Sequence, residues 1–558
     1  MALKLLTIAV AILVAATTNV VCQKSDVNNL RKLLVDHFSN DRHHVTNPAG
    51  KTAAAKFVSD TFRSYGLLTW EWPFQGEHGY TGTNIFGMWP GRNTGRVADR
   101  PVVLTADLDT DKGRPGRDDN GSGMAALLET ARLITSQSCM QDNSIFFAVF
   151  DFEEKSSGSD GACAAGSCGS KEFSNYVIKP YIDLTKKDPA EWSGIITLDS
   201  ILNYNSSAMA QTIPDEDTFK EAPGLTNVYQ SVKANNQKGD FIFVVYRTNG
   251  DSTLQSEFDQ KWAAEDNPQY KILSAGIPYK NITAMIDAKE GPYWQVYDYV
   301  VSHDASSFWK ENNDIPAIAV ADTGVLRQRE KDWREVGPAD NMDLTQDRLQ
   351  FLKKTTDVVT DMIRGMAVTQ QECRDPMSEA PSGFNSGLSL SGELTLGQDD
   401  TRIYTFKVSS FTSSGIAKAT LSNSSWSLDL EGRFDGDNHK LVLRPTPIVG
   451  DITPKPFICN MEGSLNELSD GVLYTGRLFG GCGVNGDVYE SGFVPFVLYS
   501  GDAGGSSLAL PVILSLASGI LVTALAAWFI VRRRRGYEGV QGPLLGNSGN
   551  PTSGSYQT

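Results

Sequence analysis

The sequence is short of positive charge, and this shortage excludes one class of partner. Its 558 residues contain 50 Lys and Arg against 66 Asp and Glu, which gives a formal net charge of −16. Because nucleic acids are bound through basic surfaces, a chain this acidic is expected to bind none. No internal repeat of useful period is present either, so a repeat architecture is not expected.

Long apolar runs are also scarce, and only two segments contain one. Residues 1–22 begin with the positive Lys4 and continue with an apolar core, the pattern of a secretory signal peptide. Residues 508–531 carry no charge and are long enough to cross a hydrocarbon core of roughly 30 Å as a helix. The arginines at 532–535 predict that a tail, 532–558, lies in the cytoplasm. We therefore predict a single-pass type I membrane protein at the cell surface or in the endolysosomal system, with an extracellular or lumenal ectodomain.

Cysteine is rare, and the few that occur indicate disulfides. The chain has 7 cysteines, one of which, Cys22, is removed with the signal peptide. The remaining set is typical of an ectodomain folded in an oxidising compartment. Closeness in the sequence favours the pairs Cys163–Cys168 and Cys459–Cys482, although six cysteines allow fifteen connectivities.

Asparagine sequons predict glycosylation of the ectodomain. Asn205, Asn281 and Asn423 each begin an Asn-x-Ser/Thr sequence. A fourth sequon begins at Asn120, but it lies in a tight glycine-rich loop, where we do not expect a glycan.

The ectodomain spans roughly 480 residues, a length that predicts two or more domains. Apolar residues recur at helical spacing at 27–38 and 53–65. Continuous apolar runs with turn residues at their ends follow at 102–106, 145–150, 195–198 and 315–321. Such runs are typical of strands buried on both faces of a mostly parallel sheet, and helical stretches alternate with them. We predict a three-layer α/β/α domain over residues 23–370.

The pattern changes after this domain. Over residues 371–500 the helical spacing disappears, and short β-type runs are separated by Gly, Asn, Asp and Pro. We predict a small β-sandwich there, followed by a flexible stalk at 501–507.

Carboxylates follow the predicted strands. The positions that share this property are Asp107, Asp109, Asp118, Asp119, Glu153, Glu154 and Asp199. Taken singly, each fits a helix cap or a surface charge. Together they predict a site, because α/β sheets form their sites past the carboxyl ends of the strands. Converging carboxylates repel one another unless a cation or protons hold them, so a metal site is expected.

The order of these motifs resembles one family, the co-catalytic di-zinc exopeptidases that include bacterial leucyl aminopeptidases and glutamate carboxypeptidases. The resemblance covers about 27–368. It rests on Asp107-Leu108-Asp109, the loop 115–123, Phe152-Glu153-Glu154, Leu198-Asp199-Ser200, and Asp304-Ala305-Ser306-Ser307-Phe308-Trp309 before Ile315-Pro316-Ala317.

The resemblance implies a role for each acidic residue. Asp118 would bridge two zinc ions, and Glu154 and Asp199 would each bind one. Glu153 would be the general base that takes a proton from the attacking water. Asp109 would occupy the position that orients the first metal-binding imidazole.

Two of the imidazoles expected from the family are absent. Asp107 stands at the first histidine position and Ala305 at the last. Asp107 can still bind a metal through oxygen, whereas Ala305 cannot. His303 lies two residues before Ala305 and is a candidate metal ligand in its place if the loop is bulged, or otherwise an ordinary loop histidine. Oxygen-only sites favour calcium, magnesium or manganese, so zinc is expected to be reduced, replaced by another divalent cation, or absent.

Two functions follow from these observations. The first is a membrane-anchored metallopeptidase that cuts peptides in the lumen or outside the cell. The second is a non-catalytic receptor or scaffold on a peptidase fold, similar to nicastrin-like relatives, with a peptide or protein ligand.

Overall fold

The computed structural model describes most of residues 23–500. The segments outside the described residues are 1–22, 77–78, 90, 92, 95–96, 137–140, 154–167, 180, 183–186, 281, 283–288, 302, 312–313, 324–326, 328–341, 368–383, 396–400, 413–414, 423–426, 436–439, 446–459, 469–470, 480–482, 485–486, 489–493 and 501–558. The predicted signal peptide, stalk, membrane-spanning helix and tail therefore lie outside the described residues. Among the described residues, no helix combines the length and apolarity needed to cross a bilayer.

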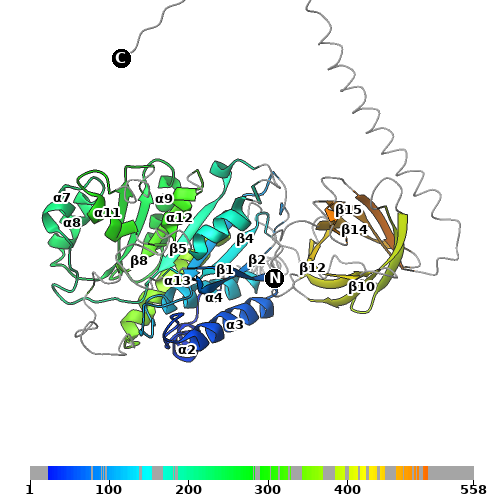
Figure 1. Cartoon of the computed structure of the whole chain (residues 1–558), viewed down its shortest axis with the longest axis horizontal. Helices are drawn as coiled ribbons and strands as arrows, with labels where there is room; N and C mark the ends of the chain where they lie inside the picture. Colours follow the sequence, from blue (N-terminus) through cyan, green and yellow to red (C-terminus); the bar gives the residue numbers. More distant parts are fainter. Residues whose placement is uncertain are drawn as a thin grey trace, which may run out of the picture. The chain divides into compact units, whose positions relative to one another are not determined.

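A mixed eight-stranded sheet forms the centre of the N-terminal part, in the order β1-β2-β4-β3-β5-β8-β6-β7 (Figure 1). Its strands are β1 (Leu68–Gln75), β2 (Thr81–Trp89), β3 (Val102–Asp107), β4 (Ile145–Phe150), β5 (Gly194–Asp199), β6 (Phe241–Arg247), β7 (Lys271–Ile277) and β8 (Ala317–Ala321). The adjacent strands β4, β3, β5 and β8 run parallel. β1, β2 and β6 introduce antiparallel pairs. The predicted apolar runs are the four central parallel strands.

Helices cover both faces of this sheet. They are α2 (Val27–His37), α3 (Pro48–Ser64), α4 (Gly121–Thr135), α5 (Gly169–Phe173), α7 (Glu216–Glu221), α8 (Thr226–Ala234), α9 (Ser252–Ala264), α11 (Trp294–Val301), α12 (Ala305–Glu311) and α13 (Gln346–Ala367). A π-helical turn lies at Ser174–Ile178 and a 3-10 turn at Pro189–Glu191. One core contains apolar residues of α2, α3, α4, α9 and α13, and a separate core contains those of α7, α8, α11 and α12. Two cores separated by the sheet make the three layers that were predicted.

Local sequence sets where these helices begin. Asp26 caps α2 by accepting from the Asn28 N–H, and Asn47 caps α3 by accepting from the Gly50 N–H. Pro48 follows as the first residue of α3, where its missing N–H costs nothing. Asn120 caps α4 in the same way, which fixes the end of the acidic loop 115–120.

The C-terminal part is a second sheet, but it is not the predicted sandwich. Its eight antiparallel strands close on themselves in the order β10-β11-β12-β13-β14-β15-β18-β9. They are β9 (Ser389–Thr395), β10 (Thr401–Phe411), β11 (Ile416–Ser422), β12 (Ser427–Asp435), β13 (Lys440–Pro445), β14 (Asn460–Leu468), β15 (Gly471–Phe479) and β18 (Val494–Tyr499). β16 (Gly483–Val484) and β17 (Asp487–Val488) form a separate hairpin. The alternation of apolar and polar residues is the same for a closed sheet and for two stacked sheets, so the pattern did not separate them.

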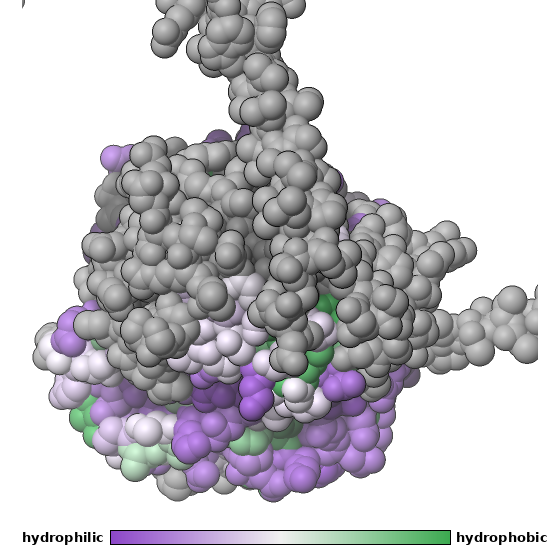
Figure 2. All heavy atoms as spheres, turned by 90° about the vertical axis from the view of Figure 1, so that its right-hand side faces the viewer, coloured by the Kyte–Doolittle hydropathy of each residue, from purple (hydrophilic) through white to green (hydrophobic). Residues whose placement is uncertain are grey.

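The exposed surface is mostly hydrophilic. Figure 2 shows the described residues of one face, on which hydrophobic areas are small and scattered. Large exposed apolar side chains occur singly along the chain, at Val35, Val45, Tyr80, Val97, Tyr176, Met209 and Tyr279.

Candidate functional site

Four neighbouring parallel strands end at one edge of the sheet, and acidic residues stand at these ends. The acids are Asp107 and Asp109 at β3, Asp151 and Glu153 after β4, Asp199 at the end of β5, and Asp322 after β8. The carboxyl ends of adjacent parallel strands meet at one edge, so these side chains share one region of the domain. Asp304, directly before α12, interacts electrostatically with Asp107 and Asp199.

Repulsion among these carboxylates is apparent in their pKa values. Burial raises the pKa of Asp107 well above its usual range, and the carboxylates of Asp199 and Asp119 raise it further. Burial also raises the pKa of Asp304 to about 7. The Asp199 carboxylate adds to this increase, whereas His303 opposes it. Close, buried like charges of this kind favour protons or a cation in their midst.

Asn120 holds Asp107 and the neighbouring strand end in place. Its amide Nδ2 donates to Asp107 Oδ1 and, at 2.7 Å, to the Leu198 carbonyl. Its Oδ1 accepts from the N–H groups of Gly123 at 2.9 Å and Ser200 at 3.2 Å. Asn120 is fully buried, which agrees with our expectation that its sequon carries no glycan. The other oxygen of Asp107, Oδ2, is buried and meets no hydrogen-bond donor among the described residues.

Asp118 and Asp119 face different surroundings. Asp118 Oδ1 accepts from the Leu202 N–H at 3.0 Å, and its carboxylate acts on the buried Arg327. Asp119 instead acts on Asp107. The role predicted for Asp118, a bridge between two metal ions, stays a prediction.

His303 lies against the site, as the sequence suggested it could, but both of its ring nitrogens are engaged. Nδ1 is 2.8 Å from Asp199 Oδ2, and Nε2 is 3.1 Å from the Val300 carbonyl. A carbonyl and a carboxylate are both acceptors, so this geometry fits a ring that donates from both nitrogens. Burial disfavours the charged ring, but the Asp199 carboxylate outweighs burial and the pKa of His303 is raised. The methyl group of Ala305 is fully buried at the start of α12 and offers no ligand atom.

Glu153 follows β4 and remains partly exposed. Its backbone N–H donates to Asp109 Oδ1 at 3.0 Å. Asp109 is fully buried, and burial followed by the nearby Asp151 raises its pKa well above the usual range. Asp109 was predicted to orient an imidazole, whereas here it positions the backbone of Glu153. Glu154, a predicted ligand, lies outside the described residues.

Comparison with known proteins places this part of the chain. Residues 84–252 match the model of peptidase family M28. This segment is therefore similar to the members of that family. Leupeptin-inactivating enzyme 1 of Streptomyces exfoliatus is 26% identical over 182 residues, which are 33% of this chain and 36% of the relative. The chain thus matches about a third of that relative's length.

Solved structures similar to this chain include a glutaminyl cyclase, an aminopeptidase and an exopeptidase. Porphyromonas gingivalis glutaminyl cyclase is 19% identical with a TM-score of 0.38, covering 62% of this chain and 98% of its own. The Legionella pneumophila LapA aminopeptidase is 14% identical with a TM-score of 0.39, covering 62% and 73%. A Zn-dependent exopeptidase from Parabacteroides distasonis is 15% identical with a TM-score of 0.37, covering 61% and 99%.

The M28 family suggests zinc, yet the described side chains do not fit two zinc ions. Among them, no three His, Cys, Asp or Glu side chains converge closely enough to hold a metal. Asp107 presents a single oxygen, Oδ2, since Oδ1 is taken by Asn120. His303 presents no lone pair, because both nitrogens donate. A zinc site needs three or more protein ligands, so we assign no zinc-dependent step to these residues.

Two buried cationic side chains, Lys51 and Arg42, bind residues around the acidic site, and neither was predicted. Lys51 Nζ binds both oxygens of Asp151, at 3.0 and 2.9 Å. The guanidinium of Arg42 donates to five backbone carbonyls, those of Phe38, Asn40, Leu108, Pro115 and Gly116. Asp151 follows a strand like the other acids and was open to the same reasoning. Arg42 and Lys51 lie in helical or loop sequence that gives no sign of their burial.

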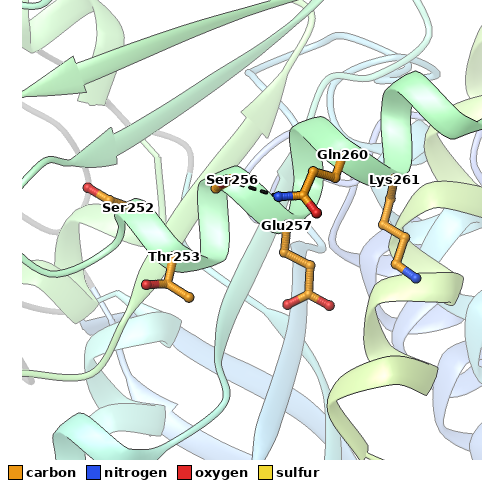
Figure 3. Close-up of a pocket in the computed structure, with 6 residues that line it drawn as sticks. All are labelled: Ser252, Thr253, Ser256, Glu257, Gln260 and Lys261. Carbon is orange, nitrogen blue, oxygen red and sulfur yellow. Dashed lines mark hydrogen bonds between the residues drawn. The ribbon is translucent and has the colours of Figure 1, made fainter.

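A groove on α9 is separate from the acidic site. It has a volume of about 590 Å³ and is lined by Ser252, Thr253, Ser256, Glu257, Gln260 and Lys261 (Figure 3). All six belong to one helix, and none is a predicted site residue.

The remaining predicted sites are only partly covered by the structure. Cys168 is disulfide-bonded, and the other predicted disulfide cysteines lie outside the described residues, so both pairings stay predictions. Asn205 is half-buried, and its Oδ1 accepts from the Ser207 N–H at 3.0 Å. Asn281 and Asn423 lie outside the described residues.

Proposed function

We propose that the M28 domain is the ectodomain of a single-pass membrane protein that binds peptides or proteins without hydrolysing them. The observation that carries this proposal is the arrangement of His303 and Ala305. Both ring nitrogens of His303 are within hydrogen-bond distance of acceptor atoms, and Ala305 presents only a buried methyl group. This stretch of chain therefore offers no nitrogen ligand for the hydrolytic metal.

The acidic site has the chemistry to bind a cationic group. Asp107 and Asp304 are buried with raised pKa values, and Asp107 Oδ2 has no donor among the described residues. The free α-ammonium group of a peptide would supply both positive charge and N–H donors. A ligand with a free N-terminus is therefore the favoured class.

This ligand class can be tested on the full-length protein in detergent. Binding of fluorescent peptides should weaken at least tenfold when the N-terminus is acetylated, since acetylation removes the charge. Asp107→Asn should weaken the free peptide but not the acetylated one. Equal affinity of both peptide forms would contradict the proposal.

An M28-type exopeptidase is the second candidate, and Glu153 favours it. Glu153 is partly exposed, and Asp109 fixes its backbone next to the acidic cluster, which suits a general base. Under this alternative, divalent ions would bind through carboxylate oxygens, and a panel of aminoacyl and dipeptide substrates would be cleaved.

Metal analysis and substrate assays separate the two candidates. We expect fewer than two zinc ions per chain and no turnover in the unmodified protein. Asp107→His with Ala305→His should raise the zinc content. The matched control, Lys112→His with Lys310→His, adds two histidines at exposed positions and should not. Two bound zinc ions with turnover that is lost in Glu153→Gln would establish the peptidase instead.

A further inference from the structure

The loop between α2 and α3 contains a buried histidine whose hydrogen bonds require it to be neutral. His43 is fully buried, and its Nδ1 accepts the Val45 N–H at 3.1 Å. Its Nε2 meets no hydrogen-bond partner among the described residues. Because Nδ1 must keep its lone pair, the single ring proton is on Nε2. A second proton on Nδ1 would point directly at the Val45 N–H and break this turn.

Charged groups from three segments surround His43. Asp41, whose Oδ1 accepts the His43 N–H at 2.8 Å, and Asp111 favour a charged ring, whereas Lys112 and Lys51 oppose it. Burial is the largest influence, and the pKa of His43 is lowered. The ring of His44 lies only 4.2 Å away between centroids. The lowered pKa and the hydrogen-bond geometry therefore agree: both indicate that His43 is neutral in the closed loop.

The same loop contacts the residue that precedes Glu153. The ring of His44 lies 4.8 Å from the ring of Phe152 and 4.8 Å from that of Tyr80. Phe152 has a left-handed backbone, with φ of 61°, and its ring fills space at Gly76 and Gly82, where an added Cβ would lie 2.5 Å from it. Movement of His44 would therefore remove one wall from Phe152, beside the acidic site.

The neighbouring residues limit how much of the loop can move. Arg42 is anchored to five carbonyls, including those of Leu108, Pro115 and Gly116. On the other side, Asn47 Oδ1 accepts the Gly50 N–H at 3.0 Å and its Nδ2 donates to the Asp41 carbonyl at 2.9 Å. The Asn47 N–H closes the turn itself, because it donates to the His43 carbonyl at 3.0 Å. Opening would be confined to residues 43–46, between these two anchors.

We propose that protonation of His43 opens the 43–46 turn in mildly acidic conditions and releases His44 from Phe152. The open loop, with His43 in water, takes up a proton near its usual pKa of about 6.5. The closed loop disfavours that proton, so the closed form is fully stable above this pH and is weakened as the pH falls below it. The inference concerns access to the site for which peptide binding is proposed, but its test uses no ligand and stands apart from that proposal.

Hydrogen exchange of the Val45 amide in the full-length protein tests this opening. After correction for the intrinsic pH dependence of exchange, we expect this amide to exchange faster at pH 5.5 than at pH 7.5. One imidazole titrating from about pH 6.5 sets a ceiling of about tenfold on the effect. Unchanged protection of Val45 between the two pH values would overturn the proposal.

Two variants identify the titrating group. In His43→Asn the side-chain oxygen can still accept the Val45 N–H but cannot be protonated, so the pH response should disappear. His37→Asn is the matched control and should keep the pH response. Like His43, His37 has a lowered pKa, but it is only partly buried and its ring stacks on Phe57. A pH response that persists in His43→Asn would overturn the proposal.

Direct titration covers the case in which His43→Asn does not fold. Exchange of the imidazole C2 hydrogen, followed by mass spectrometry of the unmodified protein, gives the pKa of His43 itself. We expect a value below 6.5, and a value at or above 6.5 would show that the closed loop does not disfavour the proton.

Discussion

Replacement of Arg42 by methionine is expected to be among the most destabilising single changes in the N-terminal α/β domain. Three of its hydrogen bonds are short, to Leu108 at 2.8 Å, Gly116 at 2.9 Å and Pro115 at 3.0 Å. Methionine fills much of the same volume but leaves buried carbonyls without donors, and each such loss costs about 1–3 kcal/mol. Some of the carbonyls will find water, so we expect a total loss of about 3–5 kcal/mol, as for other broken buried charge networks.

Urea unfolding of the full-length protein, followed by tryptophan fluorescence, measures this loss. Four buried tryptophans among the described residues report on the N-terminal α/β domain: Trp89, Trp192, Trp262 and Trp309. Arg42→Lys should lose less than Arg42→Met, because lysine keeps the charge but not the planar fork of donors.

A surface arginine of the same region provides the control. Arg114 pairs with Asp111 at 2.9 Å, with side chains 30% and 45% exposed. A pair this exposed contributes no more than about 1 kcal/mol, so Arg114→Met should be nearly neutral. If Arg42→Met loses no more stability than Arg114→Met, the five carbonyls are not what Arg42 stabilises, and the reasoning is refuted.

Three further predictions follow from the same structure. Lys51→Met should cost about 3–5 kcal/mol because it leaves Asp151 buried and unpaired, and adding Asp151→Leu should restore part of that loss in the same unfolding assay. For Asp304, whose pKa is raised from 3.8 to about 7, the folded state favours the protonated acid, so stability is lost as the pH rises from 4 towards 8. Asp304→Asn should remove this loss, which unfolding midpoints at pH 5 and pH 8.5 will show. Deletion of residues 508–558 should release the ectodomain into the medium, and its retention in carbonate-washed membranes would contradict the predicted topology.

The central strands were predictable because their signal is local. β3, β4, β5 and β8 are continuous apolar runs, and burial on both faces of a parallel sheet requires such runs. β6, Phe241–Arg247, has a comparable run, but it was not among the predicted strands. Closure of the C-terminal sheet depends on the pairing of β18 with β9, whose paired residues are more than one hundred positions apart. Alternation along a single strand contains no information about such a pairing.

The presence of acids at the strand ends was predictable because that signal is local in the sequence. The contacts between these acids and the residues around them were not predictable. That acids stand at the strand ends follows from sequence, since each run ends where its acid begins. Which of Asp118 and Asp119 faces Asp107 depends on backbone dihedrals within one loop. The pairing of His303 with Asp199 joins residues 104 apart and depends on how the segment before α12 packs. Neither the loop conformation nor the contact between His303 and Asp199 can be read from the spacing of residues in the sequence.

The balance of charge at the site links its two unusual positions to its proposed ligand. Lys51 compensates Asp151, and His303 compensates Asp199. The pKa values of three further acids, Asp107, Asp109 and Asp304, are raised, although Lys51 also acts on Asp109 and His303 on Asp304. Two of them stand at or beside the predicted imidazole positions, 107 and 305. An imidazole at 107 would bring a nitrogen ligand, whereas Asp107 brings a carboxyl group whose Oδ2 meets no hydrogen-bond donor among the described residues. A buried carboxyl group whose pKa is raised by neighbouring acids favours a cation that also supplies N–H donors, so an ammonium group is the occupant that we propose.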